Sequence, residues 1–166
     1  MFEGERSVEL YIRQKVFSLR DRFSVLDFAG NDKYFVEGEF FSLRNKLHIY
    51  DTAGREVAYI YRKLFSFLPR YYVYTNGEYI AEIVREFTFL TPRYRIDGLG
   101  WRVEGDIFEH NYVIYEGERP VASIYKKWFS WGDCYVLDIK NDEDEIPALA
   151  VVLAIDCTLA LQESSS

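Results

Sequence analysis

The sequence predicts a mainly β protein, in which a closed barrel of about twelve strands wraps around a C-terminal hydrophobic α-helix. Two observations lead to this fold class. Aromatic-rich, strand-like units recur along most of the chain, with turn residues between them. One long segment near the C-terminus, Pro147–Leu161, has no hydrophilic face. A helix that is apolar all round must be buried all round, and strands that close around it can bury it.

Length and composition fit one domain of this kind. The chain has 166 residues, enough for one sizeable core, and we expect a single domain over residues 1–166 with its core at 10–161. Aromatic residues make up 18% of the chain, and they favour strands. The net charge of −7 argues against nucleic acid as a partner, because nucleic-acid binding requires a basic face.

The strand prediction depends on an internal repeat. The motif Ile-x-x-Lys-x-Phe-Ser occurs at 12–18, 60–66 and 124–130, and a looser copy begins at Ile83. Each copy is followed by a short loop and a second strand-like run. The pair Asn76-Gly77 separates two apolar runs and is the preferred pair of two-residue hairpin turns. Four related units of three strands would give about twelve strands, at the spacing of an all-β barrel.

The last unit ends differently, because an acidic segment and then the apolar segment follow it. Asp142–Glu145 would place carboxylates at the positive end of the predicted helix. Asp144 suits the N-cap position and Pro147 suits the first helical turn. We therefore expect a central helix at about 147–161 and a frayed tail at 162–166.

Neither a membrane span nor a secreted protein is expected. The apolar run Ala148–Leu161 has 14 residues and contains Asp156, whereas a transmembrane helix needs roughly 20 apolar residues. The N-terminus lacks the basic and apolar regions of a secretory signal. Cys134 and Cys157 have no CxxC partner. We expect a cytoplasmic protein, peripheral at a membrane if it binds one, with no cofactor and no metal.

Three cations recur at one position of the strand units. Before each of Arg62, Arg85 and Lys126, the two preceding alternate positions of the strand hold an alanine and an isoleucine. Alternate residues of a strand share a face. If those small and aliphatic residues face the core, the cations leave it at the barrel rim. There they could hold an anionic head group through charge-assisted hydrogen bonds. Alternatively, they are snorkelling side chains that end the strands and pair with carboxylates.

Asp156 is the one charged residue of the predicted helix. Burial of an unpaired carboxylate is costly, and two interpretations remain open. Asp156 contacts a ligand or handles a proton at the barrel mouth, or it is the structural partner of an Arg, a Tyr or a backbone donor. No nucleophile or phosphate-loop motif occurs, so we predict a protein that is not an enzyme.

Aromatic residues recur in the loops of the repeated units as well. They could anchor the protein at a membrane interface or a partner, or they could plug the barrel ends. The plug is the simpler hypothesis and is our prediction. The residues concerned are Phe65, Phe67, Phe87, Phe89, Trp128, Phe129 and Trp131.

Together these motifs resemble those of the LURP-one-related family. The resemblance is carried by the Ile-x-x-Lys-x-Phe-Ser units and by Val36–Glu39, Val103–Asp106, Phe129–Asp133 and Ala148–Cys157. It covers nearly the whole chain and implies membership of the tubby C-terminal-like superfamily, which also contains the phospholipid scramblases. The implied fold is a twelve-stranded β-barrel closed around a C-terminal hydrophobic helix, in agreement with the residues themselves.

The resemblance also implies a binding function. Tubby domains bind phosphoinositide head groups through a basic patch, and scramblase-like relatives act at membranes with a cysteine cluster that this chain lacks. We expect a non-catalytic, tubby-like binding module for an anionic phospholipid head group, a membrane surface or a small anionic ligand. The alternative is a structural or protein–protein interaction domain with a protein partner. The candidate ligand-binding residues are Arg62, Arg85, Lys126 and Asp156.

Overall fold

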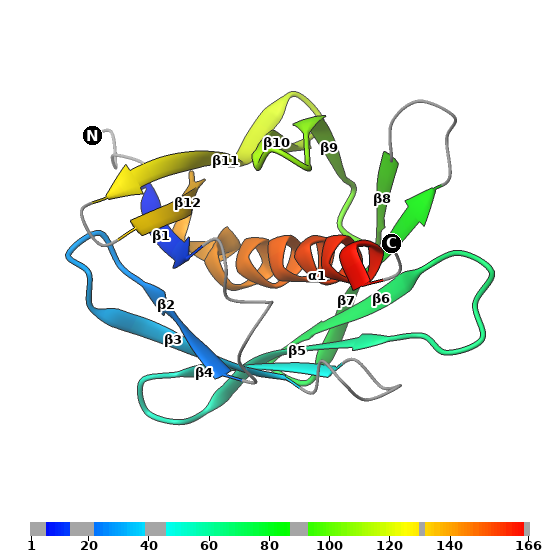
Figure 1. Ribbon diagram of the computed structural model, residues 1–166, viewed down its shortest axis with the longest axis horizontal. Coiled ribbons are helices and arrows are strands. Elements are labelled where there is room, and N and C mark those ends of the chain that lie inside the picture. The colour runs from blue at the N-terminus through cyan, green and yellow to red at the C-terminus, as the bar shows by residue number, and fades with distance from the viewer. Residues whose placement is uncertain (1–5, 14–21, 39–45, 87–92, 130–131, 165–166) are drawn as a thin grey trace.

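The computed structural model describes residues 6–13, 22–38, 46–86, 93–129 and 132–164, and it confirms the predicted fold class. Twelve antiparallel strands form one closed barrel, in which each strand pairs with the next and β1 pairs with β12 (Figure 1). The strands are β1 (Val8–Arg13), β2 (Arg22–Leu26), β3 (Asp32–Gly38), β4 (Lys46–Asp51), β5 (Glu56–Arg62), β6 (Arg70–Thr75), β7 (Glu78–Glu86), β8 (Arg93–Asp97), β9 (Trp101–Asp106), β10 (Asn111–Glu116), β11 (Arg119–Phe129) and β12 (Gly132–Ile139).

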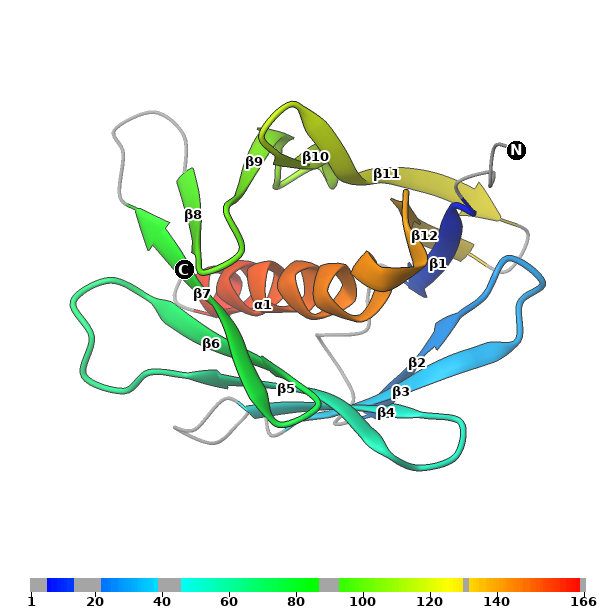
Figure 2. The same cartoon turned by 180° about the vertical axis from the view of Figure 1, so that it is seen from behind.

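The barrel surrounds the helix α1 (Glu145–Ser164). Figures 1 and 2 show α1 running through the middle of the ring of strands from both sides of the molecule. Every residue from Ala148 to Ile155 is completely buried, as an apolar helix requires. The helix packs mainly against β5, β6, β7 and β12.

The helix is longer than the sequence predicts at both ends. A short 3₁₀ helix, η2 (Asp142–Asp144), leads directly into α1. The α-helix begins at Glu145, before the predicted start at Pro147. The Glu145 carboxylate lies 2.6 Å from the Lys33 ammonium group, and it is held at the positive end of the helix dipole. At the other end, residues 162–164 are helical instead of frayed, because Gln and Glu have about the same helix propensity as Leu.

The internal repeat is visible in the pairing register of two hairpins. Ile60 of β5 faces Val73 of β6, and Ile124 of β11 faces Leu137 of β12. All four side chains are buried against the core. Since successive strand residues alternate between faces, the residues between them point outward. The two repeat-related hairpins therefore share their inward pattern, and they can differ on the outer surface.

Candidate functional site

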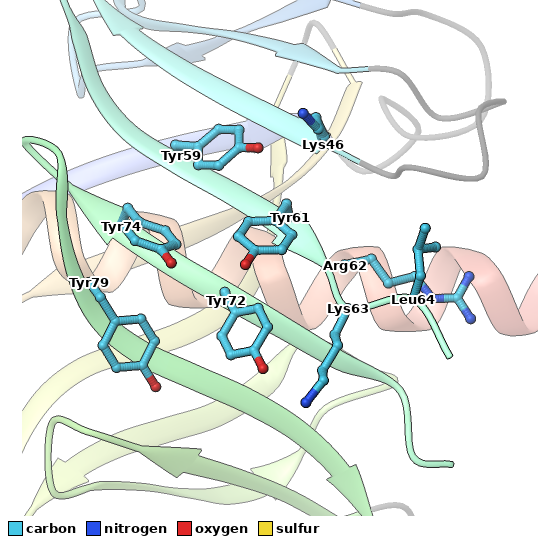
Figure 3. Close-up of a pocket in the computed structure, with 9 residues that line it drawn as sticks. All are labelled: Lys46, Tyr59, Tyr61, Arg62, Lys63, Leu64, Tyr72, Tyr74 and Tyr79. Carbon is cyan, nitrogen blue, oxygen red and sulfur yellow. The ribbon is translucent and has the colours of Figure 1, made fainter. Parts of the chain in front are cut away.

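A groove lies on the outer surface of the barrel across β4 to β7. Figure 3 shows its tyrosine side chains on the face of the strands that points away from α1. The groove has a volume of about 660 Å³. Its lining residues are Lys46, Tyr59, Tyr61, Arg62, Lys63, Leu64, Tyr72, Tyr74 and Tyr79.

Strand register brings the tyrosines of the groove together. On β5 and β6 they alternate with buried residues, and Tyr61 lies directly opposite Tyr72 while Tyr59 lies opposite Tyr74. The ring centroids of these two pairs are 5.1 and 6.0 Å apart. Tyr79 of β7 extends the row, 5.7 Å from the Tyr74 ring. Aromatic contacts of this kind contribute about 0.5–1.5 kcal/mol each beyond buried area, so the rings form a rigid floor.

Cations border this aromatic floor. The Lys46 Nζ lies 5.8 Å from the centroid of the Tyr59 ring, and the Lys63 Nζ lies 5.9 Å from that of Tyr72. Arg62 lines the groove where β5 ends. Within the part of the chain that the structure describes, no carboxylate lies within 4.0 Å of any of these three cations. Most other described cations do have such a partner: Arg22, Lys33, Arg55, Arg70, Arg95, Arg102, Arg119, Lys126 and Lys140.

Two phenol groups of the groove, those of Tyr61 and Tyr79, have a raised pKa and stay neutral at physiological pH. Burial, followed by the hydrogen bond to Tyr74, raises the pKa of Tyr61 above its ordinary value. Burial and the nearby Glu82 carboxylate raise the pKa of Tyr79 as well. The groove therefore presents positive charge and hydroxyl groups over aromatic faces, which suits an anionic ligand that also has a ring or an apolar part.

The turn between β5 and β6 adds exposed apolar residues at one end of the groove. Phe65 and Phe67 are 104% and 94% exposed, and Leu64 is 39% exposed. The prediction that loop aromatics plug the barrel is therefore wrong for Phe65 and Phe67, because their turn projects from the barrel wall. It is wrong also for Trp128, which is 77% exposed.

Phe129 does not plug the barrel either, because it packs on the outer face of the wall, in a small cluster separate from the core. Phe129 is partly buried, and its ring meets the Tyr11 ring edge-on at 5.3 Å. The predictions for Phe87, Phe89 and Trp131 fall outside the described residues.

The three predicted rim cations occupy equivalent positions on β5, β7 and β11. Each faces a buried tyrosine on the next strand; the pairs are Arg62 with Tyr71, Arg85 with Tyr94, and Lys126 with Tyr135. Strands β8, β9 and β10 separate Arg85 on β7 from Lys126 on β11. The Lys126 ammonium group lies 2.8 Å from the Glu109 carboxylate. Of the three, Arg62 lines the groove.

Asp156 lies inside the barrel, on the other side of the wall from the groove. Its carboxylate is 4% exposed, accepts a hydrogen bond from the Tyr135 hydroxyl and lies 3.1 Å from the His110 Nε2. The His110 and Tyr135 rings stack with their centroids 4.3 Å apart. A Tyr partner agrees with the structural interpretation of Asp156, whereas the pattern of the sequence does not reveal His110.

The Asp156 carboxylate favours the protonated form of His110. Burial alone lowers the pKa of His110, but the hydrogen bond to Asp156 and its negative charge outweigh burial, so the pKa is raised. Burial and the same carboxylate raise the pKa of Tyr135 well above its ordinary value. The three residues therefore form a buried polar cluster centred on the Asp156 carboxylate, in which the His110 Nδ1 has no hydrogen-bond partner among the described residues.

The described residues include neither a metal-binding cluster nor a membrane-spanning helix. No three His, Cys, Asp or Glu side chains in these ranges are placed to hold a metal ion. Within the same ranges, no helix has the length and apolar character needed to cross a bilayer.

Comparisons with known proteins agree with this fold. A family model described as LURP-one-related matches residues 8–156. The uncharacterized protein YxjI of Bacillus subtilis is 36% identical over 159 residues, which cover 96% of this chain and 98% of YxjI. An X-ray structure of a protein from Arabidopsis thaliana has a TM-score of 0.60, is 20% identical and matches over 93% of both chains. At that identity the likeness concerns the fold alone.

Proposed function

The chain belongs to the LURP-one-related family, and from this premise we propose that it is a non-catalytic, tubby-like binding barrel whose tyrosine groove holds anionic phospholipid head groups. One observation carries the proposal. In a chain with a net charge of −7, Lys46, Arg62 and Lys63 border one groove, and no described carboxylate lies within ion-pairing distance of them. Groups arranged in this way favour a ligand that supplies the negative charge itself.

The chemistry of the groove suits a phosphate-bearing head group. Arg and Lys form short, charge-assisted hydrogen bonds with phosphate oxygens, and Arg can do so with two parallel bonds. Tyrosine rings are amphipathic and are enriched where an apolar region meets water. Each cation near an anionic membrane surface contributes about 1 kcal/mol, so three cations support a weak, reversible and salt-dependent attachment. We place the protein in the cytoplasm, peripheral at an anionic membrane.

Sedimentation with vesicles tests this proposal. We expect the protein to pellet with phosphatidylcholine vesicles that contain phosphatidylserine, to stay in solution with phosphatidylcholine alone, and to detach as salt is raised. The double variant Lys46→Gln/Lys63→Gln should lose most of this binding. Lys126→Gln/Lys127→Gln changes the net charge equally at the repeat-related hairpin and should bind as the wild type does. Equal losses in both variants would mean that net charge, and not the groove, governs binding.

The alternative function is a protein-interaction domain. Rows of exposed tyrosines with cations at their border are also typical of protein–protein interfaces, where Tyr and Arg are enriched. Under this alternative, anionic vesicles do not retain the protein, whereas substitution of Tyr61 or Tyr72 abolishes the capture of a specific protein.

A further inference from the structure

The β5–β6 turn presents its apolar side chains to solvent. Phe65 and Phe67 are almost completely exposed, and Leu64 beside them lines the end of the groove. Large apolar side chains that gather on an exposed turn mark interaction surfaces more often than isolated ones do.

The turn is held at its base, so that its tip projects from a fixed position. The Lys63 backbone N–H donates to the Arg70 carbonyl at 2.9 Å, which joins the two ends of the turn. The Arg85 backbone N–H donates to the Pro69 carbonyl at 3.0 Å, which joins the turn to β7.

Phe65 also has an unusual backbone conformation. Its φ is 58°, in the left-handed region that is unfavourable for a bulky side chain. Because its side chain is fully exposed, no packing inside the fold compensates for this conformation. Backbone outliers of this kind cluster at binding and switch sites.

The charges around the turn indicate which partner it meets. Lys63 is within the turn, and Lys46 and Arg62 border the adjacent groove. Aromatic residues at a tip, with Lys and Arg set behind them, are the composition of segments that lie in the interface of an anionic membrane. The tyrosine rows of the groove would then lie at the level of the head groups, as interfacial tyrosines do.

We infer that the β5–β6 turn is a membrane-insertion loop: Leu64, Phe65 and Phe67 enter the interfacial region of an anionic bilayer whose head groups occupy the groove. This inference rests on the proposed function and adds to it. Head-group binding alone requires the cations and the tyrosines, whereas insertion requires the three apolar side chains of the turn.

The other hairpin of the repeat provides a matched control position. Trp128 is also a large exposed side chain next to lysines, at the end of β11. However, the Lys126 charge is paired with Glu109, and the outward positions of β11 and β12 carry one tyrosine, Tyr125, instead of a row. We therefore expect Trp128 to stay in water when the β5–β6 turn is inserted.

A fluorescent label reports insertion in the folded protein. Both native cysteines are buried, so a dye sensitive to polarity can be attached to Phe67→Cys, and in a second protein to Trp128→Cys. With vesicles of phosphatidylcholine and phosphatidylserine, we expect a blue shift and brighter emission from the dye at position 67. The dye at position 128 should not respond, and neither dye should respond to phosphatidylcholine alone.

Any other outcome contradicts either the insertion loop or the proposed function. If the protein pellets with anionic vesicles but the dye at position 67 does not respond, the insertion loop is wrong and head-group binding stands. If the wild-type protein does not pellet at all, the proposed function fails and the insertion loop with it. An equal response to phosphatidylcholine alone would contradict the anionic bilayer as partner.

Removal of the apolar side chains gives an independent test. The variant Phe65→Asn/Phe67→Ser should weaken vesicle binding by roughly tenfold or more, with an unchanged unfolding midpoint because both side chains are exposed and Asn tolerates a positive φ. Unchanged affinity would overturn the inference. A second result would also overturn it: the wild-type protein is a dimer, this variant is a monomer, and vesicles do not change the emission of the dye at position 67. In that case a second copy of the chain, and not a membrane, would cover the turn.

Discussion

The hairpins β5–β6 and β11–β12 come from the same internal repeat. They share the pattern of their inward side chains and differ in the side chains that point outward. Their inward positions match, as buried Tyr71 of β6 and Tyr135 of β12 show. Their outward positions do not. Where β5 and β6 carry four tyrosines, Tyr59, Tyr61, Tyr72 and Tyr74, the paired positions of β11 and β12 are Ser123, Tyr125, Val136 and Asp138.

This difference separates what the fold requires from what a site requires. Inward residues must fit against α1 and their neighbours, because barrel interiors are close-packed. Outward residues are free of that requirement, so one hairpin can carry a groove that the other lacks. The second hairpin has its own specialised feature on the inside, where Tyr135 meets Asp156 and His110. We interpret the outer feature as a binding site and the inner one as structural.

The largest effect that we expect concerns the inner cluster. Asp156→Ala removes the group that pairs with Tyr135 and His110, and it leaves both buried without that partner. Loss of one member of a buried charged pair costs about 3–5 kcal/mol, so urea unfolding should show a decrease of that order in the free energy of unfolding.

A surface pair provides the control for that measurement. Glu104→Ala removes the partner of Arg102 in an ion pair whose side chains are about half exposed, and exposed pairs contribute at most about 1 kcal/mol. If Asp156→Ala destabilised the protein no more than Glu104→Ala, the inner cluster would not be structural.

The next effect is a pH dependence of the same cluster. The pKa of His110 is raised in the folded protein, so its charged form is stabilised by folding. This contribution is complete below the ordinary pKa of about 6.5 and is lost as the pH rises through the folded pKa. Lys126 opposes the charged form, and Glu109 and Asp156 favour it.

Unfolding measured over a pH series, for the wild type and for His110→Gln, checks this expectation. The difference in stability between the two proteins should be largest in mildly acidic solution and should shrink toward alkaline pH. It should stay below the loss for Asp156→Ala, because His110 is only one of the two partners of that carboxylate. A difference that grows with pH would contradict the raised pKa.

The smallest effect concerns the outer tyrosines. A double-mutant cycle on Tyr61 and Tyr72, each changed to Ala, should give a coupling energy of about 0.5–1.5 kcal/mol from their ring contact. The repeat-related pair, Tyr125 and Val136, has no second ring and should give less. Equal coupling in both hairpins would mean that the tyrosine rows do not form a distinct rigid surface.

The barrel could be predicted from the sequence because its signals are local. The apolar segment Pro147–Leu161 and the repeated motif each lie in a short stretch of chain. The ends of α1 were harder to predict, because contacts such as Lys33 with Glu145 bring together residues far apart in the sequence. Helix propensity alone does not report such contacts.

The candidate site was less predictable, for a physical reason. Alternation marks Tyr59 and Tyr72 as outward residues, but which residues lie side by side depends on strand register. Arg62 was found through the repeat, whereas Lys46 lies outside the repeated motif. The pairing of Asp156 with His110 joins residues 46 positions apart, and no spacing rule predicts it.

The comparison between the two hairpins is tested most directly by replacing outward side chains of β5–β6 with those of β11–β12. The variant Tyr59→Ser/Tyr72→Val/Tyr74→Asn gives β5 and β6 the side chains of β11 and β12, with Asn in place of Asp so that the net charge is unchanged. Lys46, Arg62 and Lys63 all remain. The measurement is its affinity for phosphatidylserine-containing vesicles at fixed salt. We predict a loss of roughly tenfold or more, since the variant lacks three of the tyrosine rings that would contact the head-group region. Wild-type affinity in this variant would contradict the assignment of the tyrosine groove as the binding site.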